Sequence, residues 1–170
     1  KGLDLLFDTM PALLNRRDFR FVALGSGEPK YEGFFRSLVI RYPGRVSFYS
    51  GYQEKLAHLI EAGADMFVMP SRYEPCGLNQ MYSLKYGTIP VVRKTGGLAD
   101  TVAMYDPATG QGNGVLFEHF TSEGLHWALD TAMNLYQSDD DWYRMMQNGM
   151  VADFSWEVEG ARYVALYRRL

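Results

Sequence analysis

Apolar residues near the start of the chain recur at the three- and four-residue spacing of a helix. They are Leu3, Leu6, Phe7, Met10, Leu13 and Leu14. Polar residues 15–18 then separate them from a mostly apolar run at residues 19–24, so the pattern predicts a helix, a turn and a strand. Pro11 interrupts the helical pattern and has no N–H to donate. We therefore expect the first helix to be kinked or broken at about Met10.

The same alternation of strand-like and helix-like segments runs on to residue 117. Strands are expected at residues 45–50, 65–69, 90–93 and 115–117, and helices at residues 31–42, 53–62, 78–86 and 98–105. Because strands separated by helices pair in parallel, these segments predict an α/β fold in which helices cover both faces of a parallel sheet. A loop-rich surface excursion follows at residues 107–114, and further helices are expected at residues 122–136, 139–151 and 156–170.

Length and composition narrow the class of protein. A chain of 170 residues with 47% hydrophobic side chains can bury one good core, so we expect a single domain spanning residues 1–170. The net charge is -3, which gives no basic field for nucleic acid or an anionic membrane. No apolar run approaches the ~20 residues that cross a bilayer. A single cysteine fits a reducing, cytoplasmic setting, and the absence of a leader at residue 1 means that targeting is absent or that upstream chain is missing.

Ligands of parallel α/β sheets bind beyond the carboxyl ends of the strands. Four such segments, residues 25–28, 51–53, 71–77 and 94–97, are therefore expected on one rim. Gly25 and Gly27 suit either a tight turn or a close approach of backbone to a ligand. The turn at residues 95–98 suits either a phosphate at a helix start or a simple connection.

Residues 71–80 carry the strongest local signal, because a carboxylate and a small-residue turn stand directly before a helix. Glu74 could accept hydrogen bonds from sugar hydroxyls. The alternative is that Glu74 only complements the helix dipole. Local chemistry alone leaves both interpretations open.

Joined motifs give the chain a family resemblance over essentially its whole length. They occupy residues 1–4 (KGLD), 70–78 (PSRYEPCGL), 86–88 (YGT), 90–102 (PVVRKTGGLADTV) and 154–156 (FSW). In order and spacing the chain resembles the glycogen synthases and the bacterial and plant starch synthases, which are members of glycosyltransferase family five. The resemblance implies the C-terminal, Rossmann-like half of a two-domain GT-B enzyme, with ADP-glucose bound in a cleft that faces a separate N-terminal domain.

The reaction implied by this resemblance is the transfer of glucose to the non-reducing end of an α-1,4-glucan with retention of anomeric configuration, without a metal or cofactor. Glu74 is similar to the residue that holds the donor glucose and stabilises positive charge near its anomeric carbon. Lys1 is similar to the lysine that contacts the donor phosphates. The resemblance implies further donor-binding residues. Tyr52 would stack on adenine, and the sugar and phosphate site would be lined by Cys76, Gly77 and Leu78. Thr95, Gly96 and Gly97 would also bind the donor, and the two glycines would give backbone N–H groups to the phosphates.

Two departures bear on this resemblance. An arginine that precedes the family lysine and also binds phosphate is not in this chain, so the catalytic set is incomplete and the chain alone is expected to be inactive. The related family-four enzymes carry a second glutamate where this chain has Tyr82, which favours family five. The terminal helix, residues 152–170, is expected to pack on the missing domain. A plant origin would place the protein in a plastid instead of the cytoplasm.

Two alternatives to this function stay open, and the sequence argues against a third. One is a GT-B transferase that uses UDP-glucose, and another is a non-catalytic module that binds nucleotide sugar or glucan. The third, a pyridoxal-phosphate-dependent phosphorylase, needs a Schiff-base lysine in a sequence context that the chain does not offer.

Several other residues invite a functional interpretation but favour a structural one. Asp139, Asp140 and Asp141 suit the start of a helix better than a metal site. Cys76 has no histidine nearby in sequence and is expected to line the site rather than act as a nucleophile. His58, His119 and His126 lack metal-ligand spacing. An aromatic-rich stripe at helical spacing predicts core packing, part of which could face the missing domain; it consists of Trp156, Tyr163, Leu166 and Tyr167.

Overall fold

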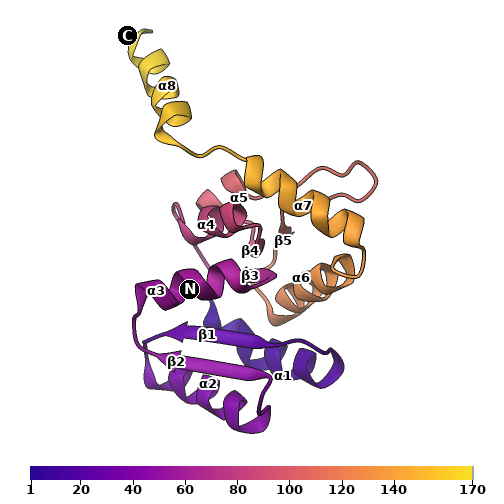
Figure 1. The fold of residues 1–170 in the computed structure, drawn as a ribbon. Helices are drawn as coiled ribbons and strands as arrows, with labels where there is room; N and C mark the ends of the chain where they lie inside the picture. The colour runs from indigo at the N-terminus through magenta and orange to yellow at the C-terminus, as the bar shows by residue number, and fades with distance from the viewer. Residues whose placement is uncertain (170) are drawn as a thin grey trace.

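The computed structural model describes residues 1–169, except for the side chain of residue 162. Helices and strands alternate up to residue 117, after which the remaining elements are helices (Figure 1). The strands are β1 (Phe21–Gly25), β2 (Val46–Ser50), β3 (Met66–Met69), β4 (Ile89–Arg93) and β5 (Val115–Phe117). A short 3-10 helix, η1 (Leu3–Leu5), precedes the helices α1 (Leu6–Arg16), α2 (Pro29–Arg41), α3 (Glu54–Gly63), α4 (Asn79–Tyr86), α5 (Gly96–Thr101), α6 (Ser122–Leu135), α7 (Asp139–Val151) and α8 (Trp156–Tyr167).

The predicted α/β fold with parallel strands is confirmed, but the strands form two sheets instead of one. β1 pairs with β2, and β4 lies between β3 and β5. The facing strands β1 and β3 line a cleft with a volume of about 1250 Å³. In Figure 1, β1 and β2 lie below this division, together with α1 and α2, and β3, β4 and β5 lie above it.

Helices hold the two sheets together. Thr9 in α1 donates a hydrogen bond to the main-chain oxygen of Ser122 at 3.1 Å, and Arg17 donates to Asp130 of α6 at 2.9 and 2.5 Å. One hydrophobic core cluster contains residues of α1, α2, β4, β5 and α6. The first sheet is therefore attached through buried helix surface, which makes its separation from the second sheet compatible with a shared core.

The first helix continues through Met10, so of the two predicted outcomes, a kink or a break, the break is wrong. α1 runs from Leu6 to Arg16 and contains Pro11. Its apolar side is almost completely buried, with Met10, Leu13 and Leu14 each about 1% exposed. Burying side chains of this size contributes roughly 1.5–3 kcal/mol each, which offsets a cost of about 3 kcal/mol for proline inside a helix.

α5 ends at Thr101, although the pattern predicted a helix up to residue 105. Val102 is extended, and the following residues pair with the end of the loop through the bridges Met104 with Gly114 and Asp106 with Gln111. The alternative backbone pairing explains why the helix stops early. The loop at residues 107–114 is thus part of the domain, as predicted.

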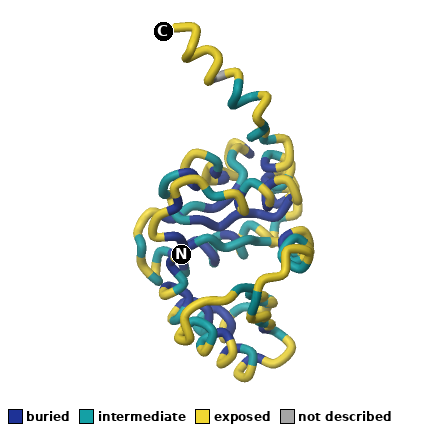
Figure 2. The backbone as a smooth tube through the Cα atoms, turned by 90° about the vertical axis from the view of Figure 1, so that its left-hand side faces the viewer, coloured by how far each residue is buried: buried dark blue, intermediate teal, exposed yellow. Residues whose placement is uncertain are grey.

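The last helix projects away from the body of the domain (Figure 1), and Figure 2 shows it as mostly exposed. The prediction that its aromatic stripe packs in the core is wrong. Trp156 is 79% exposed and Tyr167 69%, and Tyr163 and Leu166 are also exposed. A helical pattern of apolar residues shows that one face of the helix is apolar, but it does not show that the same chain buries that face. The final residue of the predicted helix, residue 170, lies outside the described residues.

Candidate functional site

Two of the predicted rim segments meet directly beyond the strands β3 and β4. The N–H of Gly97 donates to the main-chain oxygen of Glu74 at 3.0 Å. A Cβ on Gly96 would lie 2.1 Å from that oxygen, and one on Gly97 would lie 2.0 Å from the main-chain oxygen of Cys76. Because only glycine allows this approach, residues 74–77 are seated on the start of α5. These residues are called the sugar loop below, after the role that the family resemblance predicts for Glu74.

Glu74 is buried in this loop and paired with Lys1. Its side chain is 10% exposed, and the distance from Lys1 Nζ to Glu74 Oε2 is 2.6 Å. The hydroxyl of Ser71 donates to the same oxygen at 3.5 Å. α4 begins only at Asn79, and the Glu74 carboxylate is bonded to these two side chains, so the interpretation of Glu74 as a simple complement to the dipole of α4 loses its support.

Lys1 reaches the site because Gly2 packs against the end of β3. Gly2 has a φ of 73° and a Cβ there would lie 1.9 Å from the main-chain oxygen of Pro70. The Lys1 side chain, which carries the ammonium group, is 71% exposed. The structure therefore places a buried carboxylate and an accessible cation next to each other, a pairing that the sequence analysis did not predict.

Of the other residues of the sugar loop and the residue after it, Pro75, Cys76 and Leu78 are exposed and Gly77 is half-buried. Cys76 is exposed, and its thiol donates to the main-chain oxygen of Gly77 at 3.6 Å. Gly77 has a φ of 77°, a conformation that favours glycine, and Leu78 is 54% exposed. Thr95 precedes α5 in an extended conformation. These positions suit the predicted lining role, and the thiol has a main-chain partner and not a base.

The other two rim segments form a second pair, on the first sheet. The N–H of Gly51 donates to the main-chain oxygen of Gly25 at 3.1 Å, and that of Gly27 donates to the Glu32 carboxylate at 3.3 Å. Tyr52 is 82% exposed, so its ring is free to stack on a planar group. The four segments are thus joined two by two, one pair to each sheet.

The predicted phosphate-binding role of Gly97 needs revision in one respect. Its N–H already donates to Glu74, so in this structure it holds the sugar loop. Gly96 is the first residue of α5, where an N–H has no acceptor within the helix. Gly96 is therefore the glycine whose N–H is better placed for an anion.

Arg93 is a site residue for which the sequence analysis predicted no role. Its guanidinium donates to the main-chain oxygens of Ser71 at 3.4 Å, Arg72 at 2.5 Å and Glu118 at 3.2 Å. It thereby ties the residues before Glu74 to the chain that follows β5. The only signal in the sequence is an arginine at the end of an otherwise apolar strand.

A buried acid lies between α3 and α4. Glu61 is 4% exposed, and its carboxylate accepts a hydrogen bond from the Ser83 hydroxyl at 2.8 Å. The hydroxyl of Thr88 donates to the main-chain oxygen of Glu61 at 2.5 Å. Burial raises the pKa of Glu61, while the hydrogen bond from Ser83 and the charge of His58 act in the opposite direction. The acid thus links the two helices that follow Tyr52 and the sugar loop.

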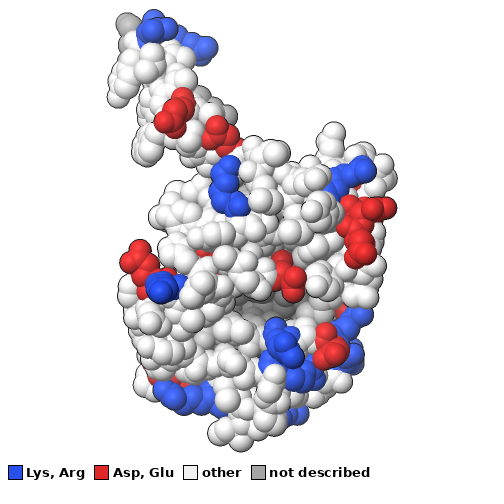
Figure 3. Space-filling model, viewed as in Figure 1, with Lys and Arg blue, Asp and Glu red and all other residues white. Residues whose placement is uncertain are grey.

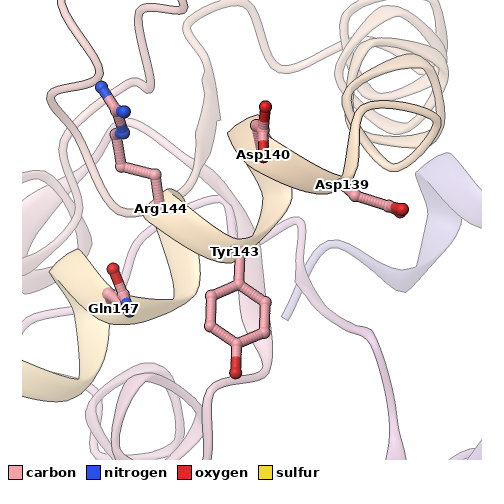
Figure 4. A pocket seen from close by; sticks show the side chains of 5 residues that line it. All are labelled: Asp139, Asp140, Tyr143, Arg144 and Gln147. Carbon is pink, nitrogen blue, oxygen red and sulfur yellow. The ribbon is translucent and has the colours of Figure 1, made fainter.

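The three acidic residues before Trp142 serve a helix start, as predicted. Ser138 accepts a hydrogen bond from the N–H of Asp141 and donates to its carboxylate, which also accepts one from the Tyr105 hydroxyl at 2.9 Å. Figure 4 shows the side chains of Asp139 and Asp140 pointing in different directions from α7. Within residues 1–169 no group of three or more acidic, histidine or cysteine residues is arranged to hold a metal ion.

Charged side chains of both signs lie on one face of the domain. Positive and negative side chains are interspersed on the face drawn in Figure 3, which is hollowed between the upper and lower parts of the domain. None of the helices within residues 1–169 is long and apolar enough to cross a membrane.

Comparison with known proteins identifies the family. The family model of the glycosyl transferases group 1 matches residues 1–148. A glycogen synthase of Anaeromyxobacter dehalogenans (strain 2CP-C) is 51% identical over 170 residues, which is 100% of this chain and 35% of the relative. A glycogen synthase of Desulforudis audaxviator is 47% identical over 169 residues, which is 99% of this chain and 34% of the relative. The chain thus spans about a third of the length of these curated relatives.

A solved structure agrees in fold. The catalytic domain of starch synthase IV from Arabidopsis thaliana, bound to ADP and acarbose, superposes with a TM-score of 0.86 at 35% identity, covering 99% of this chain and 36% of that one. The C-terminal domain of a group 1 glycosyl transferase from Francisella tularensis, at 18% identity and a TM-score of 0.63, shares the fold. With a family model that matches most of its length, the chain belongs to the glycosyl transferases group 1.

Proposed function

We propose that this chain is the donor-binding domain of a glycogen or starch synthase, which transfers glucose from ADP-glucose to the non-reducing end of an α-1,4-glucan with retention of configuration. The observation that carries the proposal is the buried Glu74 carboxylate, paired with Lys1 in a loop that rests on Gly96 and Gly97. The glycogen synthase relatives and the starch synthase structure bound to ADP support the choice of donor.

We assign a role to each residue of the site. The carboxylate of Glu74 would accept hydrogen bonds from hydroxyls of the donor glucose and stabilise positive charge as the bond to the diphosphate breaks. The ammonium group of Lys1, 2.6 Å from that carboxylate, would neutralise charge on the departing diphosphate. Tyr52 would stack on the adenine, and the N–H of Gly96 would face a phosphate.

The rest of the enzyme would complete the cleft. We propose a second domain that provides the opposite wall, binds the glucan acceptor and covers the exposed side of α8. The exposed aromatic residues of α8 support this arrangement, because large apolar side chains at such exposure favour a protein interface. We also propose that the protein works in the cytoplasm, where the exposed thiol of Cys76 would stay reduced.

The substitution Glu74→Gln in the full-length protein tests this function. It keeps the shape of the side chain and removes the charge, so we expect glucan synthesis to fall by about 100-fold or more. Glu123→Gln is the matched control, because Glu123 is an exposed acid on α6 and should leave the rate unchanged. A rate close to wild type in the Glu74→Gln protein would remove Glu74 from the mechanism.

Titration calorimetry of the full-length wild-type protein tests which nucleotide sugar is the donor. ADP-glucose should bind more tightly than UDP-glucose. Equal or tighter binding of UDP-glucose would favour the alternative donor. Donor binding with no glucosyl transfer to a glucan would favour a non-catalytic binding module instead.

A further inference from the structure

Gln80 is a completely buried amide directly beneath the sugar loop. It lies in the first turn of α4, and none of its surface is exposed. Its Nε2 lies 3.1 Å from the main-chain oxygen of Cys76, 3.0 Å from that of Gly77 and 3.2 Å from Thr101 Oγ1. Three acceptors thus surround one amide nitrogen.

Thr101 carries the contact on to the other side of the site. It is the last residue of α5, and its hydroxyl donates to the main-chain oxygen of Gly97 at 2.7 Å. Gly97 in turn donates its N–H to Glu74. The amide of Gln80 and the hydroxyl of Thr101 therefore close a ring of hydrogen bonds between the sugar loop and the helix whose first residues are Gly96 and Gly97.

The amide oxygen of Gln80 indicates that this residue acts through its amide nitrogen, which makes all of the hydrogen bonds described above. Gln80 Oε1 is buried and has no hydrogen-bond partner within the described residues. Leaving such a buried atom unpaired costs stability. An apolar side chain of the same size would avoid this cost, but it would leave the main-chain oxygens of Cys76 and Gly77 without their donor.

Gly77 and Gln80 also fit each other sterically. A Cβ on Gly77 would lie 2.4 Å from Gln80 Oε1, and Gly77 has a φ of 77° that favours glycine. The loop backbone therefore lies directly on the amide group. A change in the direction of this amide would break its hydrogen bonds to the main-chain oxygens of Cys76 and Gly77.

We propose that Gln80 and Thr101 are positioning residues that fix the sugar loop relative to the phosphate-binding start of α5. This inference rests on the proposed function, because it assigns the sugar of the donor to the loop and its phosphates to Gly96. ADP would contact only the phosphate part of this pair. ADP-glucose would span both parts, so the bond that breaks lies across the junction that Gln80 and Thr101 hold.

The test uses the full-length protein with Gln80→Met and with Thr101→Val. Both replacements keep the approximate volume and remove the hydrogen bonds. We expect the affinity for ADP, measured by calorimetry, to stay within about twofold, and kcat for glucosyl transfer from ADP-glucose to fall by about 10- to 100-fold, as for a small misplacement of reacting groups. Thr101→Ser keeps the hydroxyl and should restore kcat to within about threefold of wild type.

Gln147→Met is the control for the amide, because Gln147 is an exposed residue of α7, and it should change neither quantity. Loss of ADP affinity and kcat in equal proportion would indicate general damage and overturn the inference, as would a wild-type kcat in both variants. If Gln80→Met does not fold, the comparison of Thr101→Val with Thr101→Ser decides alone. The wild-type protein is assayed first, before any variant. If it transfers no glucose, the proposed function itself is overturned.

Discussion

A single methyl group on Gly97 should separate the two parts of the donor site. In the variant Gly97→Ala the new Cβ would lie 2.0 Å from the main-chain oxygen of Cys76 and 2.6 Å from its carbonyl carbon. An ordinary contact between such atoms needs 3.4 Å or more, and both neighbours are main-chain atoms that cannot rotate away. The loop and α5 must therefore move apart by more than about 1 Å.

The expected effect on stability follows from three contributions. Forcing an extra carbon into a packed site costs about 1–3 kcal/mol. The hydrogen bond from Gly97 to Glu74, which stretches as the segments separate, contributes about 1 kcal/mol. Alanine favours the helix over glycine by about 1 kcal/mol, which acts in the opposite direction. We therefore expect a net loss of about 1–3 kcal/mol in the free energy of unfolding.

The effect on activity should be larger than the effect on stability. A displacement of roughly 1 Å at the reacting groups lowers a rate by about 100-fold. Urea denaturation would measure the free energy of unfolding, and initial rates of glucan synthesis by the full-length protein would measure kcat. Gly33→Ala, within α2, is the matched control because no atom beyond its neighbours and the backbone of its own helix lies within 4 Å of the added Cβ. It should leave the rate unchanged and not lower the stability. A Gly97→Ala protein with wild-type stability and rate would refute the close approach on which the site depends.

Two further variants test the surroundings of the site. Because burial raises the pKa of Glu61, ionising this residue costs the folded protein stability as the pH rises through that pKa. Glu61→Gln removes the ionisable group and keeps an acceptor for Ser83. Its melting temperature should therefore rise relative to that of the wild type as the pH is raised from about 4 to about 8. A difference that shrinks with rising pH would contradict the assigned direction. Tyr52→Ala should weaken ADP binding by about tenfold, since stacking on a base contributes about 1–3 kcal/mol. The melting temperature of the protein should not change, because the Tyr52 side chain is 82% exposed. Tyr143→Ala, also at an exposed tyrosine, is its control, and an equal affinity for ADP in both variants would exclude stacking.

The order of elements was predictable because each strand and helix carries its own period in the sequence. The close pairing of Glu74 with Gly97 could also be expected, since parallel strands bring the segments after them to one edge. Periodicity shows which side of an element is apolar, however, and not what covers it. For this reason the burial around Pro11 and the division between β1 and β3 were not predicted. The stripe of α8 was expected mainly in the core, and only the family resemblance indicated that part of it could face a missing domain.

Contacts that depend on residues distant in the sequence were equally hidden. The family resemblance assigned Lys1 and Glu74 to one donor, but not the ion pair that joins them across 73 positions. Gln80 stands in the segment that the sequence marked as strongest, yet its role depends on Thr101, which reaches it only after α5 has folded back on the loop. Arg93 is similar, because its acceptors are main-chain oxygens that no sequence pattern reports.

The projecting helix α8 has a consequence for how this chain unfolds. No described residue of α8 belongs to a core cluster, whereas Trp142 and Met145 of α7 do. A helix of 12 residues has marginal stability in water when it stands alone. Its amide hydrogens should therefore exchange with solvent through local opening, at a free energy far below that of α7, and the two helices behave as separate cooperative units. Slow exchange in α8 would then report directly on whatever surface comes to cover it.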